Sequence, residues 1–211
     1  MGTAFSEPLQ GMDLVPIREL IENPVRVEKH IRRELTDTGE ITETEVDVPI
    51  WVEPIAEGQT PMCGALGLVK TILESWLGSH VESRPPLVVN ITDGAASDGD
   101  PRVPAFELRD LATDAGAVHL WNCHLSTHSG GEILYPGLNE AFPSEHYADI
   151  LLEMSSELSK ETRALLQENR LRIQMEPGSR GFVYNGDAGD LGGMLVLATT
   201  VVLPTTTRVQ S

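Results

Sequence analysis

Apolar and polar residues alternate in two runs between positions 25 and 50, and this pattern predicts two β-strands. In the first run the apolar residues occupy odd positions, and they are Val25, Val27, Ile31 and Leu35. In the second run, one face of the predicted strand carries Thr42, Thr44, Val46, Val48 and Ile50. The other face carries Glu43, Glu45 and Asp47. A turn signal, Asp37-Thr38-Gly39, separates the runs. We expect a β-hairpin with one face in water, inserted at residues 25–53.

A helical spacing of apolar residues follows in the stretch "GQTPMCGALGLVKTILESWLGSH". It predicts a helix over residues 61–77, with Thr60 as the N-cap, Pro61 at the first helical position and Gly78 at the end. We expect the helix to pack against a sheet through four side chains, Leu66, Val69, Leu73 and Trp76.

Short apolar runs then alternate with helical patterns. Strands are predicted at 87–91, 117–123 and 181–185, and helices at 104–114, at 145–169 with a break near Ser159, and at 191–201. This order predicts an α/β fold with a mainly parallel sheet, the three strands as neighbours and helices on both faces. We expect one domain over residues 1–203 and a flexible tail at 204–211.

Charge and cysteine content narrow the classes of partner. The 211 residues include 15 basic and 32 acidic side chains, a net charge of −17. This negative charge argues against nucleic acid and anionic membranes as partners. It is compatible with binding of cations or basic protein surfaces, or it serves only to keep the protein soluble. Two distant cysteines, Cys63 and Cys123, favour free thiols in a reducing, cytoplasmic compartment. The chain contains no apolar run of the ~18 residues that a membrane span needs.

Candidate metal ligands lie where the predicted strand at 87–91 ends, in the stretch "VVNITDG". Ligands bind at the carboxyl ends of strands in open α/β sheets, and Asp93 follows this strand directly. Thr60, at the start of the preceding helix, points to the same edge. Carboxylate and hydroxyl oxygens suit Mg²⁺, with waters completing the coordination. The alternative is structural, with Thr60 capping its helix and Asp93 closing a turn.

The paired stretches "GQTPM" and "VVNITDG" resemble the von Willebrand factor A (vWA) domain family. They are similar to the "GGTPM…INITDG" pattern of bacterial intracellular members, including those found with tellurite-resistance and stress proteins. The resemblance implies a vWA-like (Rossmann-like) fold and a metal-ion-dependent adhesion site, in which Thr60 and Asp93 match two of the ligands. It implies a protein-interaction module and no enzyme, with Mg²⁺ accepting an acidic side chain from a protein partner.

One family motif has no counterpart in this sequence. No Asp-x-Ser-x-Ser occurs among the 211 residues, and no long apolar strand followed by a long helix precedes Thr60. We therefore expect the family's first central strand to be absent, as in an N-terminally truncated domain. The metal site is then incomplete, and we expect no tight Mg²⁺ binding by this chain.

Two other functions stay open on the residues alone. The first is a metal-assisted hydrolase that uses Asp93 and His124, and the second is a scaffold that binds without metal. Zinc binding by Cys123, His124 and His128 is disfavoured because neighbouring strand residues point to opposite faces. Ser126 lies near both histidines but lacks a Gly-x-Ser-x-Gly elbow.

The remaining acidic residues are interpreted as solvated. Asp98 and Asp100 are expected in an exposed loop, where they add negative potential near the candidate site. Glu43, Glu45 and Asp47 are expected on the exposed face of the hairpin; the alternative is that they contact a basic partner.

Overall fold

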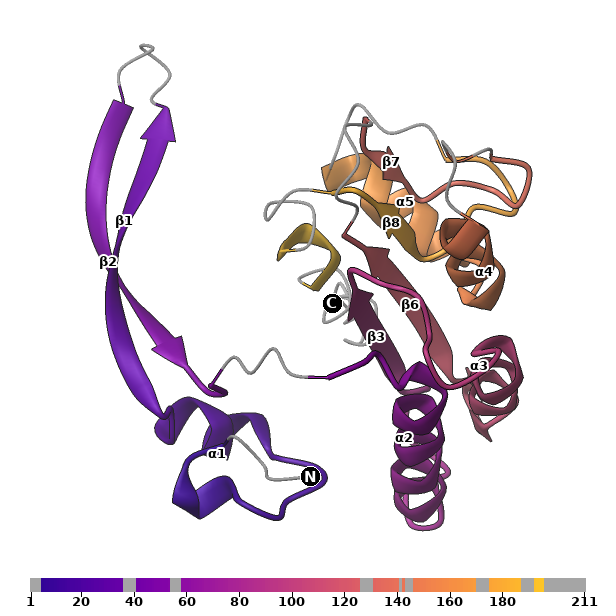
Figure 1. The fold of residues 1–211 in the computed structure, drawn as a ribbon, viewed down its shortest axis with the longest axis horizontal. Helices are drawn as coiled ribbons and strands as arrows, with labels where there is room; N and C mark the ends of the chain where they lie inside the picture. The colour runs from indigo at the N-terminus through magenta and orange to yellow at the C-terminus, as the bar shows by residue number, and fades with distance from the viewer. Residues whose placement is uncertain are drawn as a thin grey trace, which may run out of the picture. The chain divides into compact units, whose positions relative to one another are not determined.

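The chain forms two compact units, Met1–Gly58 and Gln59–Ser211 (Figure 1). The computed structural model describes residues 5–35, 41–53, 58–125, 131–140, 142, 146–169, 175–186 and 192–195. The expected tail at 204–211 lies outside these residues, and the grouping of residues 1–203 into one domain stays a prediction. No helix in these described ranges is long and apolar enough to cross a membrane.

The first unit consists of two short helices and a long hairpin. The elements are η1 (Glu7–Leu9), α1 (Ile17–Glu22), β1 (Arg26–Leu35) and β2 (Ile41–Ile50). The Trp51 indole N–H donates to the carbonyl of Leu20 at 2.7 Å and ties the hairpin to α1. The antiparallel pairing of β1 with β2 confirms the predicted hairpin. The helix α1 was not predicted, because its six residues are too few to show a clear period.

The expectation that the hairpin has one wet face is wrong. Directly opposed residues of an antiparallel pair share a face, and the register places Ile31 opposite Glu45 and His30 opposite Val46. Val27 and Ile31 therefore lie on the opposite face from Val46 and Val48, and each face also carries charge. Val27 and Ile31 stay 55% and 57% exposed. Periodicity within each strand cannot supply the register between strands.

The second unit is built on a four-stranded sheet in the order β3-β6-β8-β7. The strands are β3 (Leu87–Thr92), β6 (His119–His124), β8 (Phe182–Tyr184) and β7 (Ile133–Leu134). The first three are parallel neighbours, which confirms the predicted arrangement, and β7 runs antiparallel to β8. The two residues of β7 are too few for a sequence pattern to predict them.

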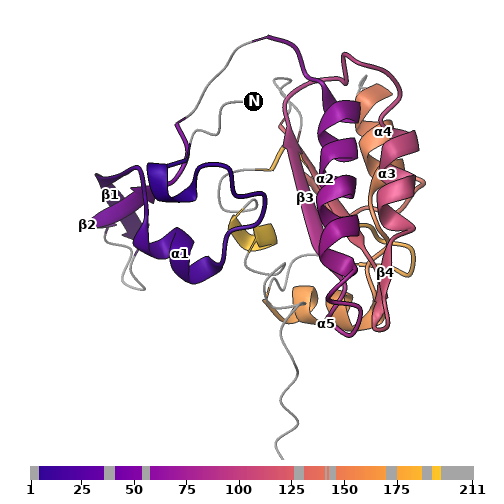
Figure 2. The same ribbon diagram turned by 90° about the horizontal axis from the view of Figure 1, so that it is seen from below.

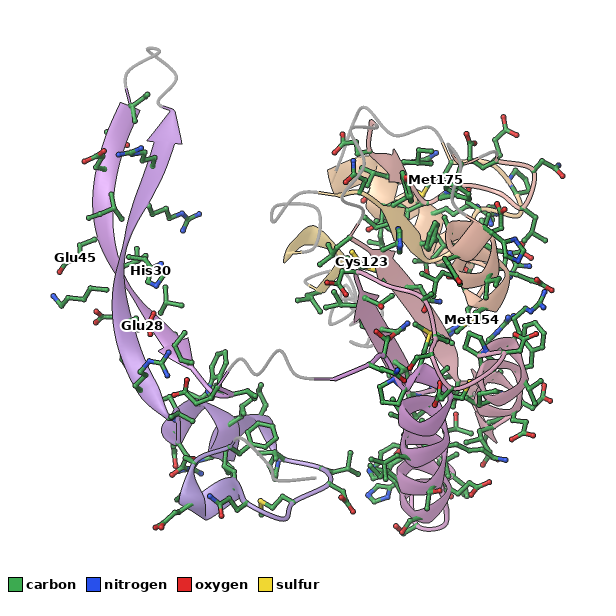
Figure 3. All side chains as sticks on the ribbon, viewed as in Figure 1. Glu28, His30, Glu45, Cys123, Met154 and Met175 are labelled. Carbon is green, nitrogen blue, oxygen red and sulfur yellow. The ribbon has the colours of Figure 1, made fainter. Side chains whose placement is uncertain are left out.

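Helices cover both faces of this sheet, as predicted. The first face carries α2 (Met62–Leu77), α3 (Arg102–Arg109) and α4 (His146–Met154), which lie on one side of β3 in Figure 2. The second face carries α5 (Lys160–Asn169), whose Leu166 packs in one cluster with Trp121 and Val183. Figure 3 labels Met154 in the first core and Cys123 and Met175 in the second. The chain thus has a mixed α/β fold with a mostly parallel sheet.

The helix α2 packs on the sheet largely as predicted. Leu66 and Leu73 are buried, and Val69 is partly buried against the same core. The predicted burial of Trp76 is wrong, because this side chain is only half-buried and stacks on the His80 ring with centroids 4.3 Å apart.

Several predicted boundaries shift in the structure. The helix expected at 104–114 is α3, which ends at Arg109, and the next residues form a tight antiparallel pair, β4 (Ala112–Thr113) and β5 (Gly116–Ala117). Gly116 has φ +143°, which a residue with a side chain rarely adopts. The predicted break near Ser159 is confirmed between α4 and α5. Of the helix expected at 191–201, residues 192–195 are helical and the others lie outside the described residues.

Candidate functional site

The candidate site lies at the carboxyl end of β3, beside the start of α2. We call this region the carboxyl rim; it comprises Thr60 and the loop 93–100. A hydroxyl of Thr92 closes the turn, because it donates to the Gly94 carbonyl at 3.0 Å and accepts from the Gly94 N–H at 3.2 Å. Thr92 is buried and Asp93 is exposed. The turn therefore fixes the backbone and leaves the Asp93 carboxylate in solvent.

Thr60 lies against this turn. Its hydroxyl oxygen is 3.5 Å from the position that a Cβ on Gly94 would occupy. Its carbonyl accepts a hydrogen bond of 2.9 Å from the N–H of Ser97. The structure thus brings Thr60 next to the residue that follows Asp93. Their role as metal ligands stays a prediction.

The predicted helix cap is wrong. The N-cap position of α2 is Pro61, and no side-chain cap bond is made there. Instead the Asp98 carboxylate accepts hydrogen bonds from the backbone N–H groups of Cys63, at 3.0 Å, and Gly64, at 2.8 Å. These N–H groups belong to the first turn of α2, where backbone N–H groups have no carbonyl acceptor inside the helix. Asp98, expected to be a solvated loop residue, is therefore the cap of α2.

This cap sets the protonation of two groups. The N–H of Gly64, followed by that of Cys63, holds the pKa of Asp98 below its usual value. Burial, and then the hydrogen bond to Asp98, raises the pKa of the Cys63 thiol. Cys63 is therefore a protonated thiol at neutral pH and a poor nucleophile. Neither Cys63 nor Cys123 is in a disulfide bond, and Cys123 is buried.

Asp100 has a structural partner of its own. The Arg102 guanidinium donates to both carboxylate oxygens and lowers the pKa of Asp100 to about 2. Another nitrogen of Arg102 reaches the Glu153 carboxylate of α4 at 3.1 Å. Asp93 differs from Asp98 and Asp100, because its carboxylate has no hydrogen bond or ion pair to any residue that the structure describes. It is the carboxylate of the rim loop that remains available to a ligand.

His124 ends β6 opposite Thr92 in the parallel register. Its side chain is only 5% exposed and stacks on the Tyr184 ring, with centroids 5.5 Å apart. Cys123 packs into the core on the other face of the sheet. These two neighbours therefore face opposite directions, as the argument against zinc requires. Ser126 and His128 lie outside the described residues.

The donors at the rim suit Mg²⁺ in kind but are few. Thr60 and Asp93 offer hard oxygen atoms, and Asp98 offsets the positive end of the α2 dipole that would otherwise repel a cation. Within the described ranges no group of three or more histidine, cysteine, aspartate or glutamate residues is placed to hold a metal ion. A bound ion would thus keep most of its waters.

Asp98 is the residue of the rim loop whose structural role the sequence did not reveal. A cap normally lies at the residue before its helix, whereas Asp98 is 35 positions away from Cys63.

Comparisons with known proteins add no further assignment, since no family model, curated protein or solved structure matches this chain.

Proposed function

We propose that this protein is an interaction module of the vWA type, with no catalytic activity. It binds a protein partner through a divalent ion, Mg²⁺, at the carboxyl rim. The observation that carries the proposal is the exposed Asp93 carboxylate, which pairs with no described residue and follows a parallel strand, next to Gly94, which lies against Thr60. The resemblance of "GQTPM" and "VVNITDG" to the family motifs supports the same site.

In this proposal the rim residues hold the ion loosely, and the partner supplies an acidic side chain to it. Thr60 and Asp93 contact the ion directly or through water. A hydrated Mg²⁺ readily adds one more carboxylate ligand, because it prefers oxygen donors. Asp98 and Asp100 are not ligands, since the α2 backbone and Arg102 already occupy them. The absent Asp-x-Ser-x-Ser motif leaves the site incomplete in this chain.

A metal-assisted hydrolase is the weaker alternative. It needs the His124 imidazole at the rim as a base for water activation near Asp93. The burial of His124 and its stacking on Tyr184 favour a structural role for this ring. The other alternative, a scaffold that works without metal, differs from the module in its response to divalent ions.

Calorimetric titration with Mn²⁺, a substitute for Mg²⁺, tests the proposal. The parent chain should bind with a dissociation constant on the order of a millimolar or weaker, because one carboxylate and one hydroxyl form a poor cage. Asp93→Ala should abolish this binding, and Asp114→Ala, a matched exposed aspartate elsewhere in the fold, should retain it. Micromolar binding by the parent would contradict the incomplete site. Unchanged binding by Asp93→Ala would place the ion elsewhere, and no binding by the parent would favour the metal-free scaffold.

A further inference from the structure

A concave surface lies at the opposite end of the sheet from the carboxyl rim. It is a cavity of about 630 Å³, lined by residues 133–140, Glu157 and residues 176–180. Residues 176–180 precede β8, and residues 135–140 follow the antiparallel β7 (Figure 1). Both segments therefore lie at the amino end of the parallel strands. We call this surface the β7–β8 groove.

Backbone hydrogen bonds hold the walls of this groove. The N–H of Arg180 donates to the carbonyl of Pro136 at 2.9 Å, and the N–H of Tyr135 donates to the carbonyl of Phe182 at 2.8 Å. Tyr135 has φ +53°, an uncommon value for a residue with a side chain, and it is buried in the core. Backbone hydrogen bonds thus join the two segments that line the groove.

The lining of the groove combines apolar and acidic side chains. Its apolar members include Leu134, Pro136, Leu138 and Pro177, and Leu138 is 55% exposed. Its acidic members are Glu140, Glu157 and Glu176, all exposed. The carboxylates of Glu140 and Glu176 make no hydrogen bond or ion pair with any described residue.

One cation, Arg180, also lines the groove, but it is engaged in the fold. Its Nη1 atom donates to the carbonyl of Ser155 and, at 3.4 Å, to that of Glu153. These carbonyls end α4, where a positive charge offsets the helix dipole. Three carboxylates against one guanidinium give the lining a formal net charge of about −2.

We propose that the β7–β8 groove binds an extended segment of a partner protein that carries arginine or lysine between apolar residues. Its volume is in the range of about 300–1,000 Å³ that ligand pockets occupy. The apolar side chains of the lining suit the aliphatic stems of arginine and lysine, and the carboxylates of Glu140 and Glu176 suit their charged ends. The net charge of −17 favours approach of a basic partner. This surface and partner are independent of the rim and of its acidic partner.

Fluorescence anisotropy with a labelled peptide, Gly-Leu-Arg-Leu-Lys-Leu-Gly, tests this inference. The double variant Glu140→Gln/Glu176→Gln should bind the peptide roughly three- to tenfold more weakly, as expected for two partly exposed ion pairs. The control Glu7→Gln/Glu82→Gln removes the same charge at exposed positions elsewhere and should bind like the parent. An equal loss in both double variants would show that only the general negative charge attracts the peptide, and this would overturn the proposal.

Variants of the apolar lining give a second readout. Leu138→Ala should weaken peptide binding severalfold, whereas Leu68→Ala, which truncates another exposed leucine, on α2 (47% exposed against 55%), should not. Binding should be the same with and without EDTA, which separates this site from the ion-dependent rim. No binding of the peptide by the parent chain, or equal binding by Leu138→Ala and Leu68→Ala, would overturn the groove as the site.

Discussion

Asp98 accepts two backbone hydrogen bonds at the start of α2 from a loop far along the chain. Asp98→Ala should therefore lower the urea midpoint of unfolding, because the N–H groups of Cys63 and Gly64 lose their partner. Asp114→Ala, which removes an exposed carboxylate with no such bond, should leave the midpoint close to that of the parent. Equal midpoints for the two variants would contradict the capping role.

The hydrogen-bonded aspartates of the rim loop, Asp98 and Asp100, should make the stability of the fold depend on pH in the acid range. The folded-state pKa is below its ordinary value for Asp98, through backbone N–H groups, and about 2 for Asp100, through Arg102. Both groups therefore stabilise the fold above the ordinary aspartate pKa of about 4, and this contribution is lost as the pH falls through the folded values. Urea unfolding between about pH 5 and pH 2 should show a steeper decline for the parent than for Asp98→Ala. Parallel curves would contradict this assignment.

Sequence patterns suggested those candidate residues that a local pattern can mark. Asp93 was identified because it directly follows an apolar strand, and Thr60 because it precedes a helix. The pairing of Asp98 with α2 was not predictable, because it joins segments that are distant in the sequence. For the same reason Thr60 was wrongly assigned as the cap, since a local rule cannot detect a remote competitor.

The start of β8 packs closely against the neighbouring strand β6, because Gly181, just before β8, lies against the side chain of Trp121. A Cβ at this position would overlap the indole of Trp121, which is 2% exposed. Gly181→Ala should destabilise the fold by ~1–3 kcal/mol or more, because the indole has no room to move. Adding Trp121→Leu should recover part of this loss in a double-mutant cycle by urea unfolding. Additive effects of the two substitutions would contradict the overlap.

The packing of α2 makes a second prediction at this scale. Leu73 is buried in the first core and Leu68, on the same helix, is 47% exposed. Leu73→Ala should reduce the free energy of unfolding by ~2–5 kcal/mol, because it leaves a cavity. Leu68→Ala should change it little. Denaturation curves of both variants provide the measurement, and equal effects would show that the face of α2 was misassigned.

Elements with long and regular patterns were the ones predicted correctly. The spacing of Leu66 and Leu73 marked α2, and the apolar run from Leu87 marked β3. The two-residue strands β4, β5 and β7 contain too few positions to show any period. The hairpin was recognised, but its register depends on the turn and on cross-strand pairs such as Arg33 with Glu43, 2.8 Å apart.

For the whole molecule, the parallel order of β3, β6 and β8 provides the basis for the proposed function. Parallel strands bring their carboxyl ends to the same end of the sheet, and Asp93 lies at this end. The β7–β8 groove lies at the other end, where the parallel strands begin. The fold class was predictable from alternating helices and strands. The groove was not, because it depends on loops on both sides of β7 and β8 rather than on any motif.

Amide NMR spectra recorded during addition of Mn²⁺ test the central claim most directly. A paramagnetic ion broadens the signals of nearby amides even when it binds weakly, so the incomplete site can still be located. The signals of Thr60, Asp93 and Gly94 should broaden first in the parent chain, and Asp93→Ala should remove this effect. First broadening at another acidic surface, such as Glu43 and Glu45 of the hairpin, would contradict the account, as would an unchanged pattern in Asp93→Ala.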